Sequence, residues 1–226
     1  MSPAEKSEIL KKSLVFSSLN EEELSGLASL SVERRFQPDE FIFWEGDEPD
    51  YFYVIAEGRV KVVKHSSSGK EFIIAFFGPG EMVGEVAVFE GKPYPASAQA
   101  VSASKVLGIS RQNFLDFLAT HPKVALRIIN ILGGRLRDAQ GRLKALAGER
   151  VEQRLAHILL MLASRMGSTL PFTRQELADM AGMTTETAIR VTSHLKERGI
   201  IRSVRGQLII LDETKLRALA EGPPII

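Results

Sequence analysis

Hydrophobic positions recur at helical spacing in two short stretches near the C-terminus, separated by a single glycine. The first stretch begins after Thr173, and Glu176 follows three residues later, which is the pattern of a capping box. Leu177 and Ala181 then share one helical face, and Gly182 stands where a helix ends in a left-handed residue. The pattern predicts a short helix that ends at Gly182.

The second stretch predicts another helix with two contrasting faces, and Thr184 is placed to cap its start. The apolar stripe consists of Ala188, Val191 and Leu195, and the opposite face carries Thr185, Glu186, Ile189, Arg190 and Ser193. An ordinary helical hairpin with a solvated polar face is the alternative. Because the caps, the turn glycine and the Glu–Arg pair come in the expected order, we interpret the segment as a helix-turn-helix with its recognition helix second.

Two runs of alternating apolar and polar residues follow this helix. Arg202–Arg205 and Gln207–Leu211 are separated by Gly206, a pattern typical of a β-hairpin. A hairpin directly after a helix-turn-helix predicts the wing of a winged-helix domain.

The stretch from Phe36 to Gly108 has a different character, because Phe, Val and Ile are frequent and glycine recurs between short strand-like runs. These runs are Glu40–Trp44, Tyr51–Ala56, Arg59–Lys64, Phe72–Phe77, Ala98–Val101 and Lys105–Ile109. Short strands at this spacing predict a β-sandwich or a barrel-like roll.

A predicted short helix over Arg111–Thr120 ends at the His121–Pro122 step, and a long helical pattern follows. Its apolar residues alternate in steps of four and three, as in a heptad seam: Ala125, Ile129, Leu132, Leu136, Ala139, Leu143 and Leu146. This seam favours a dimerisation helix, because helix-turn-helix proteins usually read two half-sites as dimers. A core helix that packs on its own domain is the alternative. Gly148 then marks a hinge before another amphipathic helix over Val151–Met166.

The composition limits the possibilities further. The chain has 226 residues, enough for two compact domains, and no apolar run approaches the ~18 residues of a membrane helix. From Arg150 onward, 11 Lys and Arg stand against 8 Asp and Glu, a mildly basic balance compatible with phosphate contacts. The N-terminus lacks the apolar core of a signal peptide, and Ile9, Leu10, Leu14 and Val15 predict a short amphipathic helix there. We therefore expect a cytoplasmic protein that does not bind membranes.

Patterns of catalysis are missing from the sequence. We find no nucleophile–base pair, no metal-ligand spacing and no phosphate-binding loop of the nucleotide-hydrolysing kind, so we expect neither an enzyme nor a metal site. The chain contains no cysteine, which excludes disulfides and iron–sulfur clusters.

The order of these elements resembles the CRP/FNR family of bacterial transcription regulators, from about Val15 to Lys215. The most specific segments are Glu81–Glu85, Phe172–Arg190 and the wing Arg205–Leu211. The resemblance implies an α+β fold: a cupin-like β-roll of the cyclic-nucleotide-binding type over residues 1–120, a dimerisation helix over 121–147, and a winged helix-turn-helix domain over 148–226.

The resemblance also implies an effector pocket in the β-roll, beneath a turn and short helix that begin at Gly84–Glu85. The residues that correspond to this pocket are Gly84, Glu85, Val86, Ala87, Tyr94, Pro95, Ala96, Ala139 and Gln140. The family's cAMP binders carry Arg–Ser where this chain has Tyr94–Pro95, and Thr–Ser where it has Ala139–Gln140. Because the cyclic phosphate loses its Arg, we expect a signal other than cAMP. A cyclic-nucleotide-responsive regulator is the alternative.

The segment Pro93–Ala100 is similar to regulators of the Dnr and HcpR type, which respond to nitric oxide and nitrogen stress, and some of these use haem. Haem would need an axial ligand, for which the candidates are His65, His121, His157 and His194, together with Met or Tyr side chains. A solvated loop histidine is the simpler interpretation of His65. A regulator without a small ligand, or with another one, remains open.

For DNA, the resemblance implies a homodimer on an inverted repeat with TGA-type half-sites, acting with RNA polymerase. The expected base contacts are Thr185, Glu186, Ile189 and Arg190. The cAMP-responsive proteins have an Arg in place of Thr185, so a second guanine contact is in doubt. Packing against a neighbouring side chain is the alternative for Ile189. The expected phosphate contacts are Thr173, Arg174, Gln175, Thr184, Thr187 and Arg205.

Overall fold

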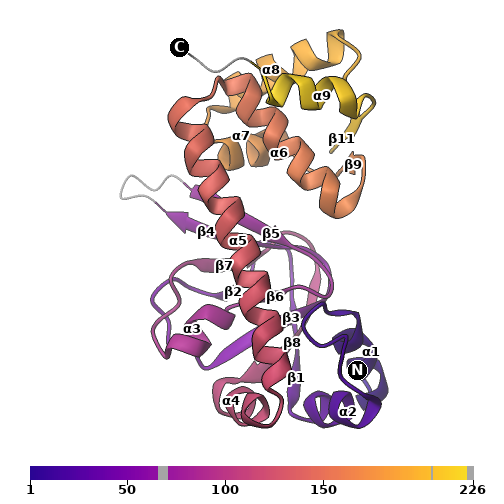
Figure 1. Ribbon diagram of the computed structural model, residues 1–226, viewed down its shortest axis with the longest axis vertical. Helices are drawn as coiled ribbons and strands as arrows, with labels where there is room; N and C mark the ends of the chain where they lie inside the picture. The colour runs from indigo at the N-terminus through magenta and orange to yellow at the C-terminus, as the bar shows by residue number, and fades with distance from the viewer. Residues whose placement is uncertain (66–70, 205, 223–226) are drawn as a thin grey trace. The chain divides into compact units, whose positions relative to one another are not determined.

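A computed structural model describes residues 1–65, 71–204 and 206–222 (Figure 1). The chain divides into two compact units, residues 1–133 and 134–226, and the boundary falls within one long helix. Among the described residues, no helix combines the length and the apolar character that a membrane crossing needs.

The N-terminal unit combines helices with two antiparallel sheets. Its helices are α1 (Pro3–Lys12), α2 (Glu21–Ser29), α3 (Glu85–Glu90), α4 (Arg111–Thr120) and the start of α5 (Pro122–Gly148). Its strands are β1 (Ser31–Phe36), β2 (Phe41–Phe43), β3 (Tyr51–Glu57), β4 (Val60–His65), β5 (Glu71–Phe77), β6 (Met82–Val83), β7 (Ser97–Ala100) and β8 (Ser104–Ser110). One sheet has the strand order β1-β8-β3-β6, and the other has β2-β7-β4-β5. The predicted β-roll is confirmed.

Strand β3 shows how the alternation of side chains fills two separate cores. Phe52 and Val54 face the helices and join the core that α1, α2, α4 and the start of α5 cover. Tyr53 and Ile55 point the other way, into a core between the sheets. The roll is therefore packed on the inside and along one outer face.

The C-terminal unit contains the remaining elements and the rest of α5. These elements are α6 (Val151–Met166), β9 (Thr169–Leu170), α7 (Arg174–Ala181), α8 (Thr185–Glu197), β10 (Ile201–Val204), β11 (Gln207–Ile210) and α9 (Glu213–Ala220). The hairpin β10–β11 pairs with β9 in a three-stranded antiparallel sheet. The predicted helix-turn-helix and wing are confirmed, although Arg205 lies outside the described residues.

The hydrophobic pattern does not predict β1, α2 or α9. Strand β1 carries charged side chains at three successive positions, Glu33–Arg35, which conceal its alternation. Helix α2 begins with a capping box between Asn20 and Glu23, and α9 is capped by Asp212. Both caps are signals in the sequence that identify these helices.

The N-terminal helix differs from the pattern that predicts it. Helix α1 ends at Lys12, so Leu14 and Val15 lie beyond it, and the prediction is wrong for these two residues. Leu10 and Val15 are buried, whereas Leu14 is 76% exposed. The helix stops at Ser13, which has an extended backbone conformation.

Candidate DNA interface and effector pocket

Local capping bonds fix both helices of the helix-turn-helix where the sequence predicts them. The Thr173 hydroxyl accepts a hydrogen bond from the Glu176 backbone N–H at 3.2 Å, and the Glu176 carboxylate accepts one from the Thr173 backbone N–H at 2.7 Å. Thr184 caps α8 by accepting from the Thr187 backbone N–H at 3.3 Å. Gly182 has φ +62°, the left-handed conformation that suits glycine.

Arg154 of α6 hydrogen-bonds to the turn between these two helices. Its guanidinium donates to the carbonyl of Ala181 at 3.1 Å and to that of Gly182 at 3.3 Å. A cation at a helix C-terminus satisfies carbonyls that lack helical partners and interacts favourably with the helix dipole. This role of Arg154 depends on the fold and has no local signal in the sequence.

The outer face of α8 presents side chains to the surroundings. Glu186, Arg190 and Ser193 are exposed, and Ile189 is 50% exposed. The opposite stripe of Ala188, Val191 and Leu195 is buried, as the sequence predicts. Within the described part of the chain, no hydrogen bond or ion pair engages the side chain of Glu186 or Arg190. Both side chains therefore face outward with their bonding capacity unused.

Thr185 and Gln175, predicted to contact DNA separately, are bonded to each other. The Thr185 hydroxyl donates to the Gln175 side-chain carbonyl, and the Gln175 amide donates to both carboxylate oxygens of Asp179 at 2.9 Å. The Gln175 amide group is thus occupied on both sides. The sequence analysis does not identify Asp179, whose only signal is its position one helical turn after Gln175.

Arg174 connects the helix-turn-helix to the wing. Its Nη2 donates to the hydroxyl of Ser203 on β10 at 2.5 Å. Arg174 is half-buried, so part of its guanidinium remains accessible. The contact places a cation at the start of α7 and beside the wing.

In the β-roll, aromatic rings fill the space beside the turn at Gly84. Gly84 precedes α3 with φ +84°, and a Cβ atom there would lie 3.0 Å from Cε1 of Tyr94 and 3.2 Å from Cε1 of Phe43. The Tyr94 ring stacks on Phe43 with a centroid separation of 3.9 Å, and its hydroxyl donates to the Tyr51 carbonyl. Burial raises the pKa of the Tyr94 hydroxyl, which stays protonated and donates.

Arg34 closes the other end of this aromatic cluster. Its guanidinium lies 4.7 Å from the centroid of the Tyr51 ring, and it donates to the Tyr53 hydroxyl at 3.1 Å. Burial raises the pKa of Tyr53 as well. The sequence analysis does not identify Phe43, Tyr51, Tyr53 or Arg34 as neighbours of the predicted pocket, because only the pairing of distant strands brings them there.

The other predicted pocket residues are divided. Glu85, Ala87 and Ala96, which lie within three residues of Gly84 or Tyr94 in the sequence, are buried. Val86 and Pro95 are exposed. Ala139 and Gln140 are exposed on the part of α5 that belongs to the C-terminal unit. The described structure thus brings together Gly84 and Tyr94 with Phe43, and Val86 and Pro95 face outward.

Each of the four histidines lies beside a glutamate. In the N-terminal unit, His65 is exposed with Nε2 3.9 Å from Glu71, and His121 stacks on Phe117 with Nε2 3.4 Å from Glu23. In the C-terminal unit, His157 and His194 each lie 3.3 Å from a glutamate carboxylate.

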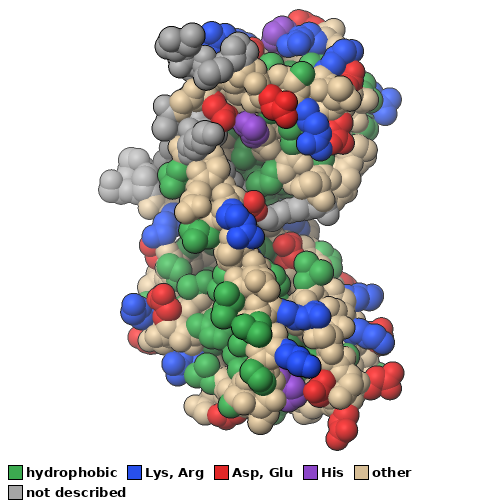
Figure 2. All heavy atoms as spheres, in the orientation of Figure 1, with side chains coloured by type: hydrophobic (Ala, Val, Ile, Leu, Met, Phe, Trp, Pro, Cys, Tyr) green, Lys and Arg blue, Asp and Glu red, His purple; other side chains and the backbone are tan. Residues whose placement is uncertain are grey.

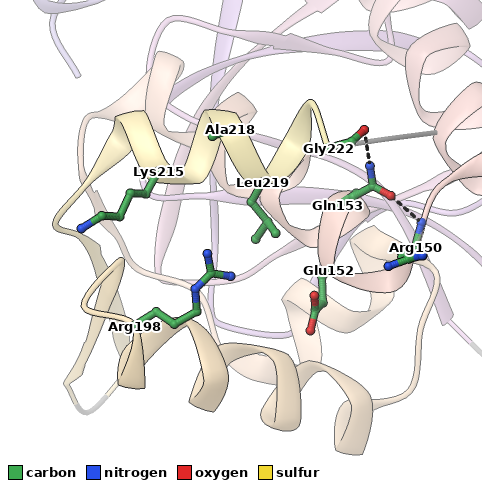
Figure 3. Close-up of a pocket in the computed structure, with 8 residues that line it drawn as sticks. All are labelled: Arg150, Glu152, Gln153, Arg198, Lys215, Ala218, Leu219 and Gly222. Carbon is green, nitrogen blue, oxygen red and sulfur yellow. Dashed lines mark hydrogen bonds between the residues drawn. The ribbon is translucent and has the colours of Figure 1, made fainter. Parts of the chain in front are cut away.

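A hollow in the C-terminal unit has a mixed lining of charged, polar and apolar residues (Figure 3). Its lining is Arg150, Glu152, Gln153, Arg198, Lys215, Ala218, Leu219 and Gly222. The Gln153 side chain accepts from the Arg150 backbone N–H at 3.0 Å and donates to the Gly222 carbonyl at 3.2 Å. Arg198 follows the end of α8, about 12 Å along the helix from Arg190, so the hollow is separate from the outer face that Glu186 and Arg190 share.

Helix α5 has a buried and an exposed apolar face in the N-terminal unit. Val124 and Ile128 are buried, and Leu132 packs against the same core. Ala125 is half-buried, whereas Leu126 and Ile129 are 62% and 61% exposed. Figure 2 shows hydrophobic side chains gathered along this part of the helix.

The exposed apolar residues continue along α5 in the C-terminal unit. Leu136 and Leu143 are 60% and 67% exposed, and Ala139 is exposed. The side chain of Leu146, the last residue of the predicted seam, lies outside the described residues. The sequence seam omits Leu126, which is apolar and exposed, and includes Leu132, which already has partners in its own core.

A capped helix-turn-helix with an exposed outer face, a wing and a β-roll defines a DNA-binding regulator. The family model of the cyclic nucleotide-binding domain matches residues 33–121, and that of the Crp-like helix-turn-helix domain matches residues 153–219. The chain belongs to the CRP/FNR family of DNA-binding transcription regulators, which are not enzymes.

Two relatives and two solved structures illustrate this membership. The chain is 31% identical over 214 residues to the cyclic AMP receptor protein of Thermus thermophilus, covering 94% of this chain and 99% of that protein. It is 29% identical over 219 residues to the nitrogen fixation regulation protein FixK of Bradyrhizobium diazoefficiens, covering 93% and 91%. The structure of FixK2 from Bradyrhizobium japonicum matches with a TM-score of 0.77 at 25% identity, covering 85% and 98%. The catabolite activator protein of Thermus thermophilus matches with a TM-score of 0.55 at 31% identity, covering 92% and 98%.

The close packing at Gly84 predicts an unequal response of two glycines. Gly46 and Gly84 both have positive φ, but a Cβ atom at Gly46 would meet nothing within 4 Å. Alanine at either position therefore carries the same kind of backbone strain, and only Gly84→Ala also collides with Tyr94 and Phe43. We expect Gly84→Ala to lower the free energy of unfolding by about 1–3 kcal/mol more than Gly46→Ala does. Urea denaturation followed by the fluorescence of the only tryptophan, Trp44, measures the difference. Equal losses would show that the rings do not occupy this space.

Proposed function

We propose that the protein is a homodimeric regulator that binds an inverted repeat with TGA-type half-sites and responds through its β-roll to a signal other than cAMP. The observation that carries the DNA part is the outer face of α8, where Glu186 and Arg190 are exposed and lack partners among the described residues. The capping bonds and Arg154 hold this face in a fixed orientation.

Base recognition follows from the chemistry of the exposed side chains. Arg190 can donate two hydrogen bonds to O6 and N7 of guanine in the major groove, and Glu186 can accept one from N4 of cytosine. Arg190 can therefore read the guanine of TGA, and Glu186 can read a cytosine in the same pair or in a neighbouring one. Ile189 is exposed, which supports contact with a thymine methyl group over packing within the unit.

Phosphate contacts follow from the helix ends. Thr173 and Thr184 begin α7 and α8, where free backbone N–H groups and the positive end of the helix dipole favour an anion. The half-buried Arg174 adds a full charge at the start of α7, and Thr187 lies within the first turn of α8. Because the Gln175 amide is already bonded, Gln175 would contact a phosphate through its backbone N–H. Arg205 stays a prediction from the sequence.

Dimer formation is supported by the exposed apolar stripe of α5. Large apolar side chains at 60% exposure or more recur along one helix, which is unusual for a surface that stays in water. We place Leu126, Ile129, Leu136, Ala139 and Leu143 in the seam, with Leu146 as a prediction from the sequence alone. Ala125 and Leu132 lie at its inner edge, where Leu132 also supports the core.

The effector is the finer part of the proposal. Tyr94 supplies neither a positive charge nor an empty space beside Gly84, and both would be needed for a cyclic phosphate. This favours a non-cAMP signal, among which a nitrogen-stress signal of the Dnr and HcpR type stays a prediction from the segment Pro93–Ala100. The alternative is a cyclic-nucleotide-responsive regulator, favoured by the likeness to a protein named cyclic AMP receptor protein. We place the regulator in the cytoplasm, with RNA polymerase as its partner.

The assignment of base and phosphate contacts predicts different effects for two arginines. Arg190→Ala should lower affinity for an inverted TGA repeat by roughly five- to 150-fold per half-site and remove the preference over a scrambled duplex. Arg174→Ala should weaken binding to both duplexes similarly and reduce the salt dependence, because phosphates carry no sequence information. Fluorescence anisotropy at two salt concentrations measures both. Full discrimination by the Arg190 variant would contradict the assignment.

The proposed seam predicts that one charge on α5 separates the subunits. Leu136→Asp should raise the dissociation constant of the dimer on the order of a hundredfold or more, because each dimer loses two buried leucines. Sedimentation equilibrium of the full chain measures this change. Leu14→Asp is the matched control, since Leu14 is 76% exposed and lies outside α5. A dimer that withstands the Leu136 change would place the interface elsewhere.

The filled pocket predicts the response to cyclic nucleotides. Calorimetric titration of the full chain with cAMP or cGMP should show no saturable heat, because Tyr94 occupies the space beside Gly84. The double variant Tyr94→Arg/Pro95→Ser should bind cAMP more tightly than Tyr94→Ala/Pro95→Ser, because only the first supplies a charge for the phosphate. Saturable binding by the unaltered chain would favour the cyclic-nucleotide alternative.

A further inference from the structure

The side chains of Asp179, Gln175 and Thr185 form a continuous chain of hydrogen bonds between the two helices of the helix-turn-helix. Asp179 is 8% exposed, and its two carboxylate oxygens accept from Nε2 of Gln175 at 2.9 Å each. Oε1 of Gln175 accepts from the hydroxyl of Thr185, the first residue of α8. The chain thus links a buried charge on α7 to the start of the recognition helix.

The direction of these bonds is fixed by the carboxylate. An ionised carboxylate only accepts hydrogen bonds, so it orients the Gln175 amide with its NH₂ group inward. The amide carbonyl must then point to Thr185, and the single hydroxyl proton of Thr185 is used in that bond. Thr185 consequently has no proton to donate to a DNA base.

Thr185 can still offer DNA its methyl group, besides the lone pairs of a hydroxyl oxygen that is turned toward Gln175. The methyl and the hydroxyl branch from the same Cβ atom at the tetrahedral angle, so holding the hydroxyl against Gln175 turns the methyl away from it. Thr185 is only half-buried, and it lies one position before Glu186 on the exposed N-terminal part of α8. In the major groove, the complementary apolar group is the C5 methyl of thymine.

We infer that Asp179 acts through Gln175 as a positioning residue, which fixes the Thr185 methyl so that it selects a thymine flanking the TGA core. A guanine in the same place presents only the acceptors O6 and N7, which Thr185 cannot satisfy. The inference rests on the proposed function, since it assumes that α8 enters the major groove of a TGA-type site.

Deoxyuridine provides a direct test, because it differs from thymidine only by the C5 methyl group. Each thymine that flanks the TGA core in one half-site is replaced in turn, and binding of the full chain is measured by fluorescence anisotropy. We expect one flanking thymine at which the replacement weakens binding by about fourfold, the effect of losing one buried methyl contact. No loss at any flanking thymine overturns the inference.

Variants separate positioning from a general structural effect. Thr185→Ser keeps the hydroxyl and removes the methyl. This variant should therefore bind the thymine and the deoxyuridine duplexes with about equal affinity. Asp179→Asn removes the charge that orients Gln175, and it should reduce the same sensitivity while discrimination of the TGA core remains. Thr214→Ser is the matched control, because Thr214 is exposed on α9 outside the proposed DNA interface, and it should keep the fourfold effect.

The outcomes distinguish the inference from the proposed function. If the chain prefers the TGA repeat but Thr185→Ser retains the fourfold effect, the thymine contact belongs to another residue and the inference is wrong. If Asp179→Asn retains it while Thr185→Ser loses it, Thr185 reads the methyl without help from Asp179, and the positioning role is wrong. If the unaltered chain shows no preference for a TGA repeat over a scrambled duplex, the proposed function itself fails.

Discussion

The turn at Gly182 is the constraint on which the DNA interface depends. Its left-handed backbone, φ +62°, sets the direction in which α8 leaves α7, and another residue there would pay about 1–2 kcal/mol. Arg154 reinforces the turn by binding the carbonyls of Ala181 and Gly182 from α6. Because Glu186 and Arg190 have no hydrogen-bond or ion-pair partner among the described residues, this turn sets the orientation that we propose for them toward the bases.

In the N-terminal unit, Tyr94 has two physical consequences for the proposed effector pocket. Tyr94 stands where the family's cAMP binders have arginine, so the site loses the charge that would neutralise a cyclic phosphate. The ring also stacks on Phe43, and its Cε1 would lie 3.0 Å from a Cβ atom at position 84, so the site loses volume as well. Burial of the Tyr94 hydroxyl is offset by its bond to the Tyr51 carbonyl, which keeps the ring in place. Charge and packing therefore argue for the same conclusion about the effector.

The parts of this structure that the sequence predicts are those with local causes. The capping boxes, the turn glycine and the apolar stripe of α8 each arise within a few residues, and the structure confirms them. The contacts that the sequence does not predict join distant segments, such as Phe43 with Tyr94 and Arg154 with Gly182. The bond from Thr185 to Gln175 spans only ten residues, but it depends on the angle between two helices. Strand β1 is missed for a different reason, since Glu33–Arg35 carry charges on a strand that pairs along its whole length with β8.

Helix α5 carries both residues of the N-terminal core and residues of the proposed dimer seam. Val124 and Ile128 are buried in the core of the N-terminal unit, while Leu126 and Ile129, within the same two turns, are exposed. A helix is rigid over this length, so a change in core packing that moves Val124 or Ile128 also moves Leu126 and Ile129. In the proposed dimer the latter two residues contact the second subunit. In that proposed dimer, a signal that alters the packing of the N-terminal unit would reach the seam through one helix, without a separate relay.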